Sequence, residues 1–122
     1  MKLRILSLSA DQDVALLRKR VLELAGHEVV APLLEKDAVK AASVKNRFDV
    51  AVLCYRMWTG KSREIMRIFR ENNPAGKVLV MVRIYGEVPD LDGDRYAVAA
   101  DGPDSLLSVL DEMRPVKTSS LP

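Results

Sequence analysis

The stretch Asp49-Val50-Ala51-Val52-Leu53-Cys54 decides the fold, because apolar residues follow one another in it without a polar interruption. A strand with one face in water alternates apolar and polar residues, whereas a strand covered on both faces does not. Residues 77–82, Lys-Val-Leu-Val-Met-Val, show the same continuous pattern. The two stretches therefore predict buried strands of a parallel sheet that carries helices on both faces.

Shorter apolar runs and helical patterns alternate on either side of these two strands and predict the remaining elements. Further strands are expected at residues 3–8, 27–31 and 95–99, and helices at residues 14–24, 37–45, 62–71 and 103–113. In the first helix, the apolar residues expected to face the core recur at spacings of three and four. They are Val14, Leu17, Val21 and Leu24.

The sequence between the last two strands departs from this alternation. Residues 83–94 contain two Gly, one Pro and four acidic residues, without an apolar stripe of helical spacing. The helix expected there is therefore predicted to be shortened or absent, which leaves one side of the fourth and fifth strands poorly covered. An uncovered apolar face indicates self-association, so a homodimer through this face is one expectation. The other is that the gap is covered from within, by Met81, Ile84, Val88 and Leu91.

Length, composition and charge limit the class of protein. The 122 residues fit one domain, expected at residues 1–113, followed by a flexible tail at residues 114–122. With 48% hydrophobic and 30% charged residues, the chain is an ordinary globular sequence rather than a disordered one. One Cys and one His exclude a disulfide scaffold and a structural zinc site. A net charge of +2 gives no reason to expect nucleic acid as a partner.

The distribution of apolar residues also bears on location. No apolar stretch approaches the roughly 18 residues of a membrane-spanning helix. The start of the chain lacks the apolar core of a signal peptide, and a single free Cys suits the reducing cytoplasm. We therefore expect a cytoplasmic protein without a membrane partner.

Several short pieces of the sequence, in matching order and spacing, resemble the receiver domain of two-component response regulators. The pieces are Ile5-Leu6, residues 11–14 (Asp-Gln-Asp-Val), residues 22–29 (Leu-Glu-Leu-Ala-Gly-His-Glu-Val), and residues 48–53, 78–81, 85–86, 96–98 and 103–107. The resemblance covers roughly residues 2–113. It implies a flavodoxin-like three-layer sandwich, an α/β fold whose five-stranded parallel sheet has the order 2-1-3-4-5.

The same resemblance implies that the phosphorylation site of the family has been replaced. Typical receivers hold Mg²⁺ on an acidic pair, accept the phosphoryl group on an Asp, and contact it with a Thr or Ser and a Lys. The corresponding residues here are Ser9 and Ala10 for the acidic pair, Cys54 for the phosphoacceptor, Val82 or Arg83 for the hydroxyl residue, and Ala99 for the Lys. Phosphoryl transfer to a carboxylate needs that carboxylate, a bound cation and positive charge. We therefore expect no phosphorylation on Asp, no metal site, no cofactor and no enzymatic activity.

The most unusual local sequence is Tyr55-Arg56-Met57-Trp58, which holds the only Trp and one of three Tyr residues. Aromatic residues, Met and Arg are enriched at protein interfaces. Trp58 either covers the sheet edge as a lid or contacts a partner. Together with Arg83 and Tyr85, these four residues are the candidates for partner binding.

The leading hypothesis is a degenerate receiver-like module for protein–protein interaction in signal transduction. The alternative is a small flavodoxin-like ligand-binding protein or thiol-dependent enzyme that uses the carboxyl edge of the sheet. Its functional group would be Cys54 or the helix start at Ser62, where Thr59-Gly60-Lys61-Ser62 weakly resembles the end of a phosphate-binding loop. Because His27 opens the second strand, it lies at the opposite sheet edge from Cys54, and we expect no Cys–His pair.

Overall fold

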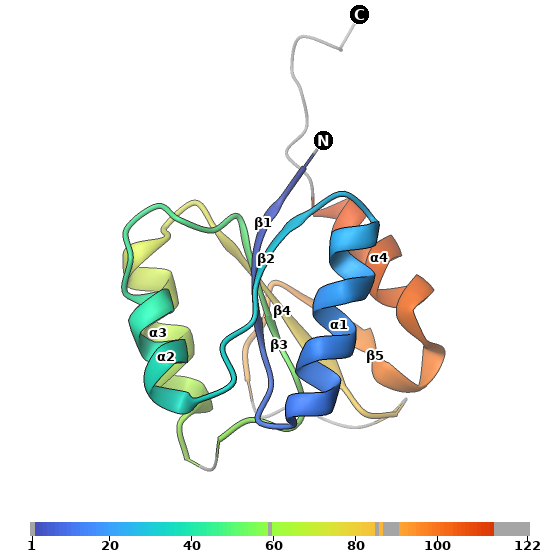
Figure 1. The fold of residues 1–122 in the computed structure, drawn as a ribbon, viewed down its shortest axis with the longest axis horizontal. Coiled ribbons are helices and arrows are strands. Elements are labelled where there is room, and N and C mark those ends of the chain that lie inside the picture. The colour runs from blue at the N-terminus through green and yellow to red at the C-terminus, as the bar shows by residue number, and fades with distance from the viewer. Residues whose placement is uncertain (1, 59, 85, 87–90, 114–122) are drawn as a thin grey trace, which may run out of the picture.

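The computed structural model describes residues 2–58, 60–84, 86 and 91–113, and Figure 1 shows their arrangement. A parallel sheet of five strands has the order β2-β1-β3-β4-β5. The strands are β1 (Arg4–Leu8), β2 (Glu28–Val30), β3 (Val50–Leu53), β4 (Lys77–Val82) and β5 (Arg95–Val98). The strand order and the parallel sheet predicted from the sequence are confirmed.

Four α-helices and one short 3₁₀ helix surround the sheet. They are α1 (Gln12–Leu24), α2 (Glu35–Ala42), α3 (Ser62–Asn72), η1 (Ala99–Asp101) and α4 (Pro103–Glu112). Helices α2 and α3 cover one face, and α1 and α4 cover the other (Figure 1). None of these helices, within the described part of the chain, has the length and apolar content that crossing a membrane requires.

The sheet separates two apolar cores, because successive side chains of a strand point to opposite faces. On the side of α2 and α3, Leu53 and Val80 pack with Phe69. On the side of α1 and α4, Val52 and Met81 pack with other buried apolar residues. All four residues of β3 are buried, as its uninterrupted apolar sequence predicts.

The connection between β4 and β5 contains no helix in its described residues, which are 83, 84, 86 and 91–94. Leu91 instead packs against the core on the α2–α3 side. Gly93 lies directly over the sheet, since a Cβ atom there would come within 2.7 Å of Val80 Cγ2. The Tyr96 hydroxyl accepts a hydrogen bond from Gly93 N (2.9 Å) and donates one to Leu91 O (3.1 Å). This segment therefore covers part of the face that the sequence left uncovered.

Of the residues expected to cover that face, only Leu91 is seen to do so among those described. Met81 points to the other core because of its place in the strand alternation. Ile84 is 48% exposed, and Val88 lies outside the described residues. The expectation was therefore wrong for Met81 and Ile84.

Polar bonds fix the same segment to its neighbours. Asp94 Oδ2 accepts a hydrogen bond from Val78 N at 2.7 Å. Arg70 on α3 donates from Nη2 to Asp92 O at 2.6 Å and lies 3.6 Å from the Asp94 carboxylate. The segment is thus tied to both β4 and α3.

The apolar stripe predicted for α1 was wrong in part. Leu17 and Leu24 are 66% and 77% exposed, whereas Ala15 and Leu22 are buried. The helix is rotated about its axis relative to the expectation, so that the small Ala15 approaches the sheet. Val14, Leu17 and Val21 instead line a groove between α1 and α4.

The second helix also differs from the prediction of residues 37–45. Helix α2 begins at Glu35 and ends at Ala42. Ser43 follows as the C-cap, and its hydroxyl donates to Val39 O at 2.7 Å. Val44 therefore lies beyond the helix and is 42% exposed.

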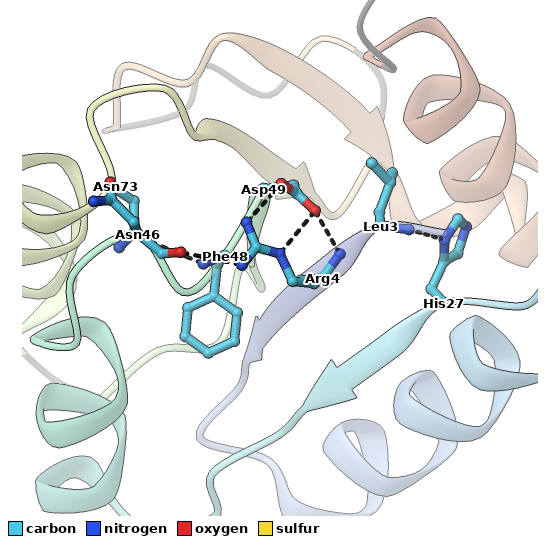
Figure 2. A network of polar contacts seen from close by, with 7 residues as sticks. All are labelled: Leu3, Arg4, His27, Asn46, Phe48, Asp49 and Asn73. Atoms are coloured by element: carbon cyan, nitrogen blue, oxygen red, sulfur yellow. Dashed lines mark hydrogen bonds and ion pairs between the residues drawn. The ribbon is translucent and has the colours of Figure 1, made fainter. Parts of the chain in front are cut away.

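At the amino ends of the strands, Asp49 joins β1 to the start of β3 (Figure 2). Its Oδ2 accepts hydrogen bonds from Arg4 N (2.8 Å) and Arg4 Nε (3.3 Å), and its Oδ1 accepts one from Arg4 Nη2 (3.1 Å). Arg4 Nη1 also donates to Asn46 O at 3.1 Å. A single carboxylate thereby satisfies a backbone N–H and fixes the guanidinium group.

Two further side chains, one on either side of the Arg4–Asp49 pair, accept hydrogen bonds from backbone N–H groups at the same edge of the sheet (Figure 2). His27 Nδ1 accepts a hydrogen bond from Leu3 N at 3.1 Å. Asn73 Oδ1 accepts one from Phe48 N at 2.9 Å, and Asn73 Nδ2 donates to Phe69 O at 3.1 Å. His27 and Asn73 are buried. Both polar side chains therefore have a structural role.

Burial raises the pKa of Asp49, but the hydrogen bonds and the charge of Arg4 lower it by more, so the pKa lies below its usual value. The ionised carboxylate therefore stabilises the fold above the pKa of the unfolded state. This stabilisation is lost as the pH falls through the folded-state pKa.

We predict that Asp49→Asn lowers the free energy of unfolding near neutral pH by about 1 kcal/mol, because the ion pair is partly exposed to solvent. The difference from wild type should shrink below about pH 4, where the unfolded carboxyl is protonated. Urea unfolding at several pH values measures both effects. Glu23→Gln, on an exposed part of α1, is the control. A stability difference that is independent of pH would contradict the prediction.

Candidate functional site

The carboxyl ends of parallel strands meet at one edge of a sheet, which is where ligands of open α/β sheets bind. Leu8 pairs with Leu53 and Val82 pairs with Val98, so the residues after these strands share this edge. Cys54 N donates to Leu8 O at 2.9 Å. The structure therefore brings Ser9, Ala10, Cys54, Val82 and Ala99 to one edge of the sheet.

Among the described residues, Asp11 supplies the carboxylate next to Ser9 and Ala10, and both of its oxygens have partners within the protein. Its Oδ1 caps α1 by accepting from Asp13 N (3.1 Å) and Val14 N (3.2 Å). Its Oδ2 forms an ion pair with Arg56 Nη1 at 3.2 Å. The ion pair could not be predicted from the sequence, because nothing in the sequence links residues so far apart.

Ser9 and Ala10 belong to the same turn. Ser9 is buried, and its hydroxyl accepts from Asp11 N (3.2 Å) and donates to Asp11 O (3.3 Å). Ala10 N donates to Arg56 O at 2.8 Å. The bond from Ala10 joins the turn after β1 to the loop after β3. The Ser9 hydroxyl and the N–H groups of Ala10 and Asp11 therefore all have hydrogen-bond partners within the protein.

Cys54 is a free thiol with 2% exposure. His27 lies at the opposite edge, where its ring nitrogen accepts a backbone hydrogen bond. Nucleophilic chemistry requires an accessible thiolate with a base or a positive charge beside it. The burial of Cys54 favours a packing role.

The loop after β3 divides into an exposed part and a packed part. Tyr55 is 39% exposed, and the Arg56 guanidinium carbon lies 5.9 Å from the centre of its ring. Met57 and Trp58 are half-buried and pack against the core on the α2–α3 side. The packing of Trp58 is the arrangement expected of a lid.

The remaining candidates lie at the end of β4 and in the connection that follows it. Val82 is buried and Arg83 is exposed. Ala100 N donates to Arg83 O at 3.2 Å, which ties the loop after β4 to η1. Tyr85 lies outside the described residues.

In the segment that weakly resembles a phosphate-binding loop, the lysine forms ion pairs within the protein. Lys61 Nζ lies 3.6 Å from the Glu64 carboxylate and 3.9 Å from that of Glu35. Thr59 is outside the described residues. Among the residues that are described, no cluster of three or more Asp, Glu, His or Cys side chains is arranged to hold a metal ion.

The overall structure is similar to that of receiver domains. The response regulator TrrA of Thermotoga maritima, solved in complex with Mg²⁺–BeF, has a TM-score of 0.74 and 22% identity over 93% of this chain and 100% of its own. Chemotaxis protein CheY4 of Vibrio cholerae has a TM-score of 0.76 and 18% identity over 93% and 100%. The receiver domain of a Pseudomonas aeruginosa sensor histidine kinase, solved with Mg²⁺ in its active-site cleft, has a TM-score of 0.75 and 15% identity over 93% and 98%.

No protein-family model and no curated protein matches the sequence. At the identities found, the structural similarity establishes the fold. The receiver-like, flavodoxin-like architecture that the sequence resemblance implied is therefore confirmed.

We predict that Cys54 of the native protein reacts with iodoacetamide at least about 100-fold more slowly than in urea, because the buried thiol reacts only after local opening. Intact mass measured over time gives both rates. Fast alkylation of the native protein at neutral pH would contradict the packing role and favour a thiol-dependent activity.

Proposed function

We propose that this chain is a receiver-like module that acts in signalling by binding a protein partner, without taking a phosphoryl group on an Asp. One observation carries the proposal. The sheet edge at which receivers carry out phosphoryl transfer holds Ser9, Ala10, Cys54, Val82 and Ala99 here. None of these side chains is a carboxylate, and the only cation that the alternative assignment of the hydroxyl position would add is Arg83.

The chemistry of phosphoryl transfer explains why this set is unsuitable. The acceptor must be a carboxylate, and a hard cation with oxygen ligands must neutralise the phosphoryl charge. Asp11 offers one carboxylate, but its two oxygens cap α1 and pair with Arg56. The Asp11–Arg56 pair joins the turn after β1 to the loop after β3, and thereby supports a fixed edge.

The exposed side chains of the same edge support a contact role. Tyr55, Arg56 and Arg83 are exposed and come from two neighbouring loops. A Tyr with two Arg residues is the composition that dominates the energetic centre of many protein interfaces. Trp58 does not belong to this exposed set, because it is half-buried and packs against the core on the α2–α3 side.

The alternative functions have weaker support. A thiol-dependent enzyme would need access to Cys54, which is 2% exposed. A homodimer through the face of β4 and β5 would use Ile84 and Tyr96, which are 48% and 43% exposed. Light scattering that gives twice the 13.6 kDa of the chain would support the dimer.

We predict that acetyl phosphate with Mg²⁺ adds no phosphoryl group to the protein, as followed by intact mass spectrometry. TrrA, which was solved with Mg²⁺–BeF, is treated in parallel as the positive control. Stoichiometric phosphorylation that hydroxylamine removes would show an acyl phosphate and contradict the proposal. Asp11→Asn would then test whether Asp11 is the acceptor.

A second prediction concerns the partner. Immobilised wild-type protein should retain a specific protein from extracts of the native cells, and a Tyr55→Ala/Arg83→Ala variant should lose at least about tenfold in affinity for it. The two substitutions remove exposed side chains, so the thermal stability should change little. The matched control is Leu34→Ala, an exposed apolar residue just before α2. Equal retention by wild type and the edge variant would exclude this surface.

A further inference from the structure

We propose that the groove between α1 and α4 binds a small molecule that has an apolar body and one anionic group, such as an aromatic carboxylate. The proposal does not rest on the function proposed above, although the groove adjoins the proposed partner surface and shares Tyr55 with it. Both proposals would hold if the binding of a ligand in the groove, rather than phosphorylation, regulates the binding of the protein partner.

The groove has a volume of about 300 Å³ and lies against the carboxyl edge of the sheet. Its walls are mainly apolar: Val14 and Val21 from α1, Met81 from β4, Ala99 from η1 and Leu106 from α4, with Tyr55 at one side. This volume is at the lower end of the range for small-molecule pockets. It suits a ligand of one or two rings.

One cationic side chain lies in this apolar wall. Arg18 follows Ala15 by three residues and precedes Leu22 by four, so the helical period places it on the inward face of α1. Arg18 lines the groove. Its Nη1 is buried and has no hydrogen-bond partner. No ion pair between described residues includes Arg18.

Nη1 itself has almost no accessible surface, but Arg18 as a whole is only partly buried, so a ligand in the groove would meet the rest of its guanidinium group. A guanidinium group without an ion-pair partner beside an apolar wall favours an anion there. Ser7 Oγ on β1 is the other buried side-chain atom without a partner among the described residues. Ser7 alternates with Ile5 and therefore faces the same side of the sheet as Arg18. Ser7 is not among the residues that line the groove, so Arg18 is the charged side chain that an anion there would meet.

The start of α4 adds a second attraction for negative charge at the same groove. Gly102 and Pro103 line the groove, and no side chain caps the helix there. The N–H groups of the first turn and the helix dipole favour an anion at this position. Since the wall offers one permanent positive charge and is otherwise apolar, a singly charged anion with an apolar body matches it best.

The test is an ¹H–¹⁵N NMR titration of the full chain with 2-naphthoate and, separately, with the neutral 2-naphthamide. We expect saturable shifts at residues 14–21 and 99–106, with a dissociation constant for 2-naphthoate of about 1 mM or tighter. The amide should bind at least about tenfold more weakly, because it cannot pair with Arg18.

Two variants make the result specific. Arg18→Met keeps an apolar side chain of similar length, and it should lose the preference for the carboxylate while the fold remains. Arg20→Met, on an exposed part of the same helix, should bind 2-naphthoate like wild type. Equal affinity for acid and amide, unchanged binding by Arg18→Met, or no saturable shift in the groove would overturn the proposal. Shifts of the same residues that depend on protein concentration alone would show instead that a second copy fills the groove.

Discussion

The burial of β3 on both faces is the constraint on which the rest of the structure depends. Val50–Leu53 are at most 1% exposed, and β3 pairs with β1 on one side and β4 on the other. A strand in this position must be covered by apolar groups on both faces, which requires one helical layer on each side. Parallel pairing then brings the loops after β1, β3, β4 and β5 to a single edge. The location of the candidate site is therefore a consequence of the core.

At that edge, interactions within the protein occupy the places where receivers use charge for chemistry. The Asp11–Arg56 pair, the buried Ser9 and the buried Cys54 form a surface that is internally satisfied. The exposed charges at this edge include the side chains of Arg56 and Arg83. Under the proposed function, the exposed groups of this edge take part in recognition, which needs a fixed and complementary surface.

The strands could be predicted because the apolar residues of β3 and β4 follow one another without interruption, a pattern that is visible in the sequence alone. The orientation of α1 could not, since Leu17 and Leu24 are as apolar as core residues and only packing shows that the small Ala15 faces the sheet. The inward position of Arg18 could not be predicted either, because it follows from the same packing of Ala15 and Leu22. The Arg4–Asp49 bonds and the Asp11–Arg56 pair had no signal in the sequence, because each joins two single residues 45 positions apart.

The described part of the connection between β4 and β5 also affects how the domain opens. Residues 92–94 are bonded to Arg70 on α3 and to Val78 on β4, and Tyr96 of β5 holds Leu91 and Gly93 in place. An edge strand is usually among the first elements to separate in local unfolding, and its amide protons then exchange with solvent quickly. The described part of the connection therefore links β5, through Tyr96, to residues that are bonded to α3 and β4. We expect these bonds to slow the exchange of the β5 amide protons relative to those of an edge strand without them.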